Sequence, residues 1–154
     1  RAVARAHKKT GVTVLTHASN WSVGLDQLDI LTEEGVDPRR IVIGHCQSYP
    51  HHEYHAEIAR RGAFVAFDRM AIPNEYEREL LFRNIKQMVD AGLTDHIVFG
   101  QDVCRRVDYV AYGGKGYGYL PSTLREDLYA IGVSQEQYHQ ITVVNARRAL
   151  TSED

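Results

Sequence analysis

The chain has 154 residues, a formal net charge of −2 and a sequence pI near 6.5. Its length suffices for one domain with a hydrophobic core, and its charge gives no electrostatic basis for binding nucleic acid or an anionic membrane. No apolar run approaches the roughly 18 residues of a transmembrane helix, and two cysteines do not suggest a disulfide framework, so we expect a cytoplasmic protein.

The chain opens with a helical pattern that Gly11 ends. It has no initiator Met, and the pattern already begins at the first residues. We therefore expect the chain to be part of a longer protein.

Short apolar segments rich in β-branched residues then alternate with longer segments of helical period. The predicted strands span about 12–17, 40–45, 63–67 and 96–101, and the predicted helices about 24–34, 52–61, 74–91, 122–131, 134–141 and 145–150. Strict alternation predicts an α/β fold with a parallel sheet and right-handed crossovers. Four such β/α units are half of an eight-stranded TIM barrel, and an open doubly wound sheet is the alternative.

Three of these strands end in a residue that can bind a metal ion. His17, His45 and Asp102 each follow a short apolar run. Because the carboxyl ends of parallel strands converge at one edge, where active sites form, we expect the three side chains to lie together. Imidazole and carboxylate suit zinc and similar divalent ions. The alternative is that each is only a polar residue bonded to a neighbouring loop.

A long segment over residues 103–120, rich in Gly and Tyr, follows the last strand. Loops of this length inside a compact domain are usually functional or disordered, so it is either a wall or lid of the pocket or a mobile surface loop. Its Gly spacing matches neither a phosphate-binding nor a dinucleotide-binding motif. Trp21 either lines the same pocket or packs against its own helix.

Other residues that could bind a metal or react give weaker predictions. The spacing of His51, His52 and His55 is not His-Glu-x-x-His, so we expect them at the rim of the pocket or on the surface rather than in a second metal site. Cys46 follows His45, so on an extended strand its side chain points to the opposite face and it is a poor ligand. Cys104 is expected to be a small buried hydrophobic residue.

Several short motifs occur together in a fixed order: Thr16-His17, Gly24-Leu25-Asp26-Gln27, Ile43-Gly44-His45, Phe67-Asp68-Arg69, Gln101-Asp102-Val103-Cys104, Tyr112-Gly113-Gly114 and Asn145-Ala146-Arg147-Arg148. Each alone is weak, but the ordered set resembles the phosphotriesterase family of the amidohydrolase superfamily, and within it the phosphotriesterase-related, lactonase-like branch. The resemblance covers essentially the whole chain. It implies the C-terminal half of a single TIM-barrel domain, strands five to eight.

The resemblance implies a site with two divalent metal ions, most simply zinc, bridged by a hydroxide. It assigns His17 and His45 to one metal, and Asp102 to the other metal and to the bridging hydroxide, whose proton Asp102 accepts. The family pattern also requires a His-x-His on the first strand and a bridging carboxylated Lys or Glu on the fourth. Neither is in this chain, which begins after those positions.

Arg69 points to the substrate class. The lactonase-like branch carries Arg at this position, facing the substrate pocket, where the organophosphate hydrolases carry His. The sequence therefore predicts a zinc-dependent hydrolase of lactones or carboxylic esters, and a homodimer when full length. The alternatives for the protein are a phosphotriester hydrolase or a non-catalytic small-molecule binding protein on the same barrel. The alternative for Arg69 is that it is an ordinary surface residue.

Overall fold

A computed structural model describes residues 1–151 and shows four parallel strands in one sheet. The strands are β1 (Val14–Leu15), β2 (Ile41–Ile43), β3 (Phe64–Phe67) and β4 (Ile97–Phe99), and they lie side by side in chain order. A doubly wound sheet reverses its strand order at a switch point, whereas a barrel adds each strand to the same side of the last. The unbroken order therefore favours the barrel arrangement.

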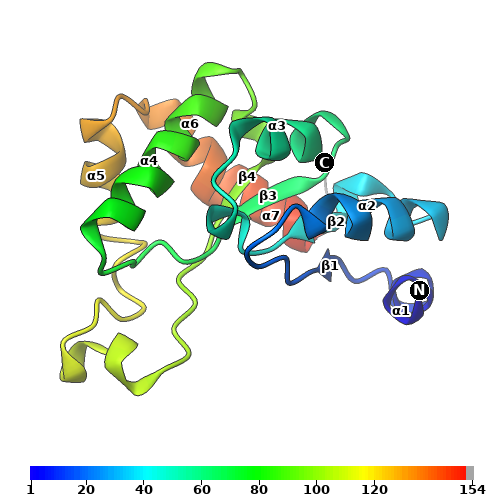
Figure 1. Cartoon of the computed structure of the whole chain (residues 1–154), viewed down its shortest axis with the longest axis horizontal. Coiled ribbons are helices and arrows are strands. Elements are labelled where there is room, and N and C mark those ends of the chain that lie inside the picture. The colour runs from blue at the N-terminus through cyan, green and yellow to red at the C-terminus, as the bar shows by residue number, and fades with distance from the viewer. Residues whose placement is uncertain (152–154) are drawn as a thin grey trace.

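Helices connect the strands. They are α1 (Ala2–Thr10), α2 (Val23–Glu33), α3 (His52–Arg60), α4 (Glu75–Asp90), α5 (Leu124–Ala130), α6 (Gln135–His139) and α7 (Asn145–Leu150). In Figure 1, α2, α3 and α4 lie along one side of the sheet, while the segment after β4 extends away from the body before α5. Within residues 1–151, no helix is long and apolar enough to cross a membrane.

The core forms between the sheet and the helices. Successive strand side chains point to opposite faces, so alternate strand residues share one face. Ile41, Ile43, Val65, Phe67 and Ile97 are completely buried in the main apolar cluster with residues of the helices. The crossover helices cover this face of the sheet. Strands of a sheet covered in this way carry continuous apolar runs, as this sequence does.

The opposite face of the sheet has a smaller apolar cluster. Val42, Phe64, Ala66 and Val98 meet Ala149 of α7 there. Leu15 of β1 pairs in register with Val42, yet it is 68% exposed. This face is therefore covered at β2, β3 and β4 but open at the β1 edge.

The elements predicted from the sequence are present, with shorter strands than expected. The predicted caps at Asn74 and Ser134 are confirmed, because each side chain accepts a hydrogen bond from the backbone N–H three residues later. The helices expected at 134–141 and 145–150 are one continuous run, joined by a π-helical segment at Gln140–Val144. Buried Asn145, which donates to the carbonyls of Thr94 and Ile97, holds this segment against the base of β4.

The open strand edges give a prediction for residues 1–154 expressed alone. Edges of apolar strands invite association, so we expect this half to dimerise or aggregate and to bind metal poorly. Light scattering after size-exclusion chromatography would measure the mass, and a Leu15→Lys variant, which places a charge on the exposed β1 edge, should associate less. A soluble monomer with full metal occupancy would contradict the prediction.

Candidate active site

The residues that follow the four strands meet at one edge of the sheet. A cavity of about 430 Å³ at this edge is lined by His17, His45, Asp68 and Asp102, together with Leu15, Thr16, Gly100 and Gln101. The parallel register of the strands brings these positions together, because each strand delivers its next residues to the same side. The three predicted ligand residues therefore line a common cavity, and Asp68, which follows β3, joins them.

The two histidines are in contact. Their ring centroids are 4.3 Å apart, with the planes at 82°. Ser19 Oγ lies 2.8 Å from Nε2 of His17, and Asp68 Oδ1 lies 2.7 Å from Nδ1 of His45. Within the described part of the chain, the second nitrogen of each ring makes no hydrogen bond. Each imidazole is thus oriented through one nitrogen and leaves the other for a further partner.

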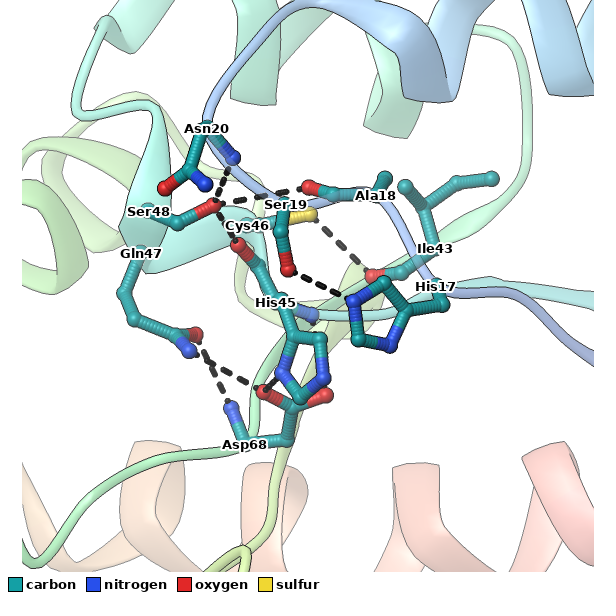
Figure 2. Close-up of polar contacts among 10 residues, drawn as sticks. All are labelled: His17, Ala18, Ser19, Asn20, Ile43, His45, Cys46, Gln47, Ser48 and Asp68. Carbon is teal, nitrogen blue, oxygen red and sulfur yellow. Dashed lines mark hydrogen bonds and ion pairs between the residues drawn. The ribbon is translucent and has the colours of Figure 1, made fainter.

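Asp68 orients His45 through both carboxylate oxygens. Oδ2 accepts the backbone N–H of His45 at 2.9 Å, while Oδ1 also accepts the side-chain amide of Gln47 at 3.1 Å. Gln47 in turn accepts the backbone N–H of Asp68 at 3.2 Å, as Figure 2 shows. A carboxylate bonded to one nitrogen of a histidine fixes the ring tautomer and raises the basicity of the other nitrogen.

Close packing at the strand ends explains two glycines. A Cβ on Gly44 would lie 2.3 Å from the carbonyl oxygen of Thr16 and 3.2 Å from Oδ2 of Asp68. A Cβ on Gly100 would lie 2.8 Å from Cβ of Asp68. Any side chain at either position would push Asp68 or a neighbouring strand away. The Gly before His45 and the Gly before Gln101 therefore keep the strand ends close together.

Two of the predicted ligand residues have left-handed backbone conformations. His45 has φ 56° and Asp102 has φ 49°, and among residues 1–151 the only other non-glycine residue with positive φ is Asn20. Such a conformation is unfavourable for L-residues and persists only where the surrounding structure holds it in place. All three lie in turns at the carboxyl edge of the sheet, so the strain is concentrated at the candidate site.

The turns after β1 and β2 are bonded to each other. Ser48 Oγ accepts the backbone N–H of Asn20 at 2.7 Å and donates to the carbonyl of His45 at 2.8 Å (Figure 2). In α3, Nε2 of the completely buried His55 lies 2.9 Å from the carbonyl oxygen of Cys46. Burial lowers the pKa of His55 to about 4, so the ring is neutral near neutral pH. These contacts hold the strained turn at His45.

Arg69 lines a second cavity, of about 370 Å³, beside the first. Gln101 and Asp102 belong to the walls of both cavities, and much of the second wall comes from the 103–120 loop. Arg69 is half-buried and forms no ion pair with any residue from 1 to 151. The loop therefore forms a pocket wall, one of the two roles predicted for it, and Arg69 faces the cavity that it encloses.

Two minor predictions need correction. His55 is not at a rim or on the surface but completely buried, because its ring packs edge-on against Phe67 at 5.1 Å. Cys104 is exposed rather than buried, because the 103–120 loop extends from the body. Trp21 is 73% exposed, which rules out the alternative that it packs against its own helix, and its role in lining the pocket stays a prediction. Cys46 is buried and donates to the carbonyl of Ile43, as expected of a residue that is not a ligand.

The donor types at the first cavity match a divalent metal ion, but the described residues do not complete a site. Within residues 1–151, no three His, Cys, Asp or Glu side chains are close enough to hold an ion by themselves. Two imidazoles with a free nitrogen each, and an exposed carboxylate at Asp102, are the donors that zinc and similar ions take. They fit a metal that has further ligands outside this chain, and their role as ligands stays a prediction.

No role was predicted for Asp68, Gln47 or Ser48. The available signal for Asp68 was its place just after an apolar strand, where His17 and His45 also stand, each one residue further from its strand. Gln47 and Ser48 lie in an irregular turn whose path no periodic pattern predicts.

Comparison with known proteins gives a consistent family. The sequence matches the phosphotriesterase family over residues 1–150. It is 34% identical over 134 residues to the phosphotriesterase homology protein of Escherichia coli (87% of this chain, 46% of that protein). It is 38% identical over 114 residues to an aryldialkylphosphatase of Saccharolobus solfataricus (71% of this chain, 35% of that protein).

Solved structures agree. The Escherichia coli homology protein, crystallised with phosphate in its active site, matches with a TM-score of 0.90 at 32% identity, covering 97% of this chain and 51% of that one. A lactonase from Listeria monocytogenes matches with a TM-score of 0.86 at 27% identity, covering 99% and 48%. The chain spans about half the length of these relatives, and its four parallel strands correspond to half of their TIM barrel. The chain belongs to the phosphotriesterase family and forms the C-terminal half of its barrel.

Proposed function

We propose that the protein containing this chain is a metal-dependent hydrolase that cleaves a lactone or carboxylic ester in a single barrel domain. The observation that carries the proposal is the convergence of His17, His45 and Asp102 on one cavity, with Arg69 in the adjoining one. Names of relatives include a phospho-furanose lactonase and the Listeria lactonase, which supports this substrate class. A homodimer of the full-length protein belongs to the same proposal.

His17, His45 and Asp102 would hold the metal ions, most simply two zinc ions, with ligands from the other half of the barrel. Such ions supply a nucleophilic hydroxide near neutral pH and polarise the bond to be cleaved. Asp68 and Gln47 orient His45 for this task. Asp102 accepts the proton of the attacking water, since its carboxylate lines the cavity and has no hydrogen-bond donor within the described residues.

Arg69 favours a lactone or ester over a phosphotriester. Negative charge develops on the carbonyl oxygen during attack, and a guanidinium at the wall can hold the ring oxygen or an attached carboxylate. A neutral phosphotriester with bulky alkoxy groups has less use for a cation. The phosphotriester alternative retains the support of one relative's name, aryldialkylphosphatase.

A non-catalytic binding protein is the second candidate. A structural neighbour from Rhodobacter sphaeroides, matched with a TM-score of 0.88 at 27% identity, is named as a resiniferatoxin-binding protein. The sequence of the other half decides between the two, because the enzyme needs a His-x-His and a bridging Lys or Glu there. Metal analysis of the full-length protein decides it independently.

Replacing Asp68 with Asn tests the orientation of His45. His45 and Gln47 both donate hydrogen bonds to the Asp68 carboxylate, so the NH2 group of an Asn at this position would face at least one donor. We expect zinc affinity of the full-length protein to fall about 10–100-fold, measured by competition with a chromogenic chelator. Asp29→Asn, on an exposed carboxylate of α2, is the matched control. Equal affinities for wild type and Asp68→Asn would remove Asp68 from the site.

Asp102→Asn tests the proton acceptor. The amide keeps a comparable shape but loses the charge and the basicity. We expect kcat of the full-length protein to fall by at least about 10²–10⁴-fold with metal in excess. Asp90→Asn, at an exposed carboxylate at the end of α4, should leave kcat unchanged. An undiminished kcat in the metal-loaded Asp102→Asn variant would rule out this role.

Arg69→Ala tests the substrate class. We expect the wild-type full-length protein to hydrolyse lactones or carboxylic esters with a higher kcat/KM than paraoxon-like triesters. The variant should lose about 10–100-fold of kcat/KM on lactones and less on triesters, because a charge-assisted hydrogen bond is lost only with the former. A wild-type preference for triesters, or an equal loss on both classes, would leave the lactone assignment without support.

A further inference from the structure

Lys115 is a cation of the second cavity that the proposed function does not use. It lines the cavity with Arg69 and Asp102, and its Nζ lies 4.0 Å from the ring centroid of Tyr119. Its ammonium group forms no hydrogen bond or ion pair with any residue in the described range 1–151. Partial desolvation, and secondarily repulsion from Arg78, lower the pKa of Lys115.

The aromatic ring beneath Lys115 is fixed by two helices. Tyr119 is only 4% exposed, and its hydroxyl donates to Oδ2 of Asp127 in α5 at 2.6 Å. Arg78 of α4 pairs with the same carboxylate oxygen at 2.6 Å. Burial raises the pKa of Tyr119 to about 12, so the hydroxyl remains a donor. The contact between Lys115 and Tyr119 thus rests on rigid elements rather than on the loop alone.

A second anchor lies next to Lys115 in the chain. The side-chain amide of Gln101 donates to the carbonyl of Gly116, and the Gly116 N–H donates to the carbonyl of Asp108 at 2.9 Å. Gly116 has φ 59°, and a Cβ there would lie 2.8 Å from a methyl group of Val110. Since Gln101 precedes Asp102, this anchor ties Lys115 to the strand end that carries the proposed proton acceptor.

The charge of the cavity is not balanced. Arg105 is paired with Asp108 at 3.1 Å, so its charge is compensated within the loop. Arg69 and Lys115 have no acidic partner among residues 1–151, although both line the same cavity. The remaining carboxylate of the wall, Asp102, belongs to the proposed metal site, so it does not compensate these two cations there. Two uncompensated cations on a concave wall attract an anionic ligand group.

We propose that Lys115 is a specificity-determining residue which, with Arg69, binds a negatively charged substituent of the substrate, a carboxylate or a phosphate. The bond to be cleaved then lies beside Asp102 and the two histidines, because Asp102 belongs to both cavities. Tyr119 and Asp127 act as positioning residues for Lys115. This inference rests on the proposed hydrolase and names the class of lactone or ester that it accepts.

The test compares matched substrates of the metal-loaded full-length protein. Two anionic lactones, 5-oxotetrahydrofuran-2-carboxylate and (5-oxotetrahydrofuran-2-yl)methyl phosphate, are compared with γ-valerolactone, which carries an uncharged methyl group at the same ring carbon. Lys115→Met should raise KM for the preferred anionic lactone about tenfold or more and leave that of γ-valerolactone and kcat within about twofold. Lys115→Arg should restore KM, and Asp127→Asn should raise the same KM by less.

Lys9→Met is the control, since Lys9 is an exposed cation on α1, far from the loop (Figure 1). The anionic lactone whose KM rises more in Lys115→Met shows whether the site binds a carboxylate or a phosphate. An unchanged KM for both anionic lactones in Lys115→Met would overturn the inference, and so would an equal rise for γ-valerolactone, because that is the sign of a merely structural role.

Binding of tetrahydrofuran-2-carboxylate and tetrahydrofuran-2-ylmethyl phosphate, which have no lactone bond, separates this inference from the proposed function. Calorimetry should give the wild type about tenfold or greater affinity over Lys115→Met for one of them. That result with no lactone hydrolysis would refute the hydrolase and keep the anion site. Lactone hydrolysis by a protein that binds neither analogue would keep the hydrolase and refute the anion site.

Discussion

A single carboxylate holds the candidate site together. Asp68 follows the third strand of the sheet, accepts hydrogen bonds from the backbone and ring of His45, and packs against the glycines at the ends of the second and fourth strands. Because it contacts three strand ends at once, any change in its position moves the residues on both sides. The distance between the two histidine rings, the path of the Gln47 turn and the shape of the first cavity all depend on this contact.

Much of the architecture was predictable because its physical cause is local or periodic. The apolar runs, the glycines that end helices and the caps at Asn74 and Ser134 act over a few residues, so the alternation of elements followed from the sequence. The meeting of His17, His45 and Asp102 at one cavity was predictable for a different reason. Parallel pairing requires that all carboxyl ends lie on one edge.

The rest depended on contacts between residues far apart in the chain. Asp68 and Gln47 acquire their role only when the second and third strands are adjacent in the correct register, which no local pattern specifies. His55 resembled a surface residue because the sequence does not show that its ring packs against Phe67. The support of Lys115 by Tyr119 and Asp127 likewise needs α4, α5 and the long loop to be in place.

The left-handed backbone at His45 and Asp102 lowers the stability of the folded chain. Glycine would adopt these conformations without strain, whereas a non-glycine residue in the left-handed region costs about 1–2 kcal/mol. Selection for stability alone would therefore remove both side chains from the edge of the sheet. A chain that keeps them accepts a less stable fold, and a search for thermostable variants would tend to replace these two residues early, at the cost of the ligands that the proposed function requires.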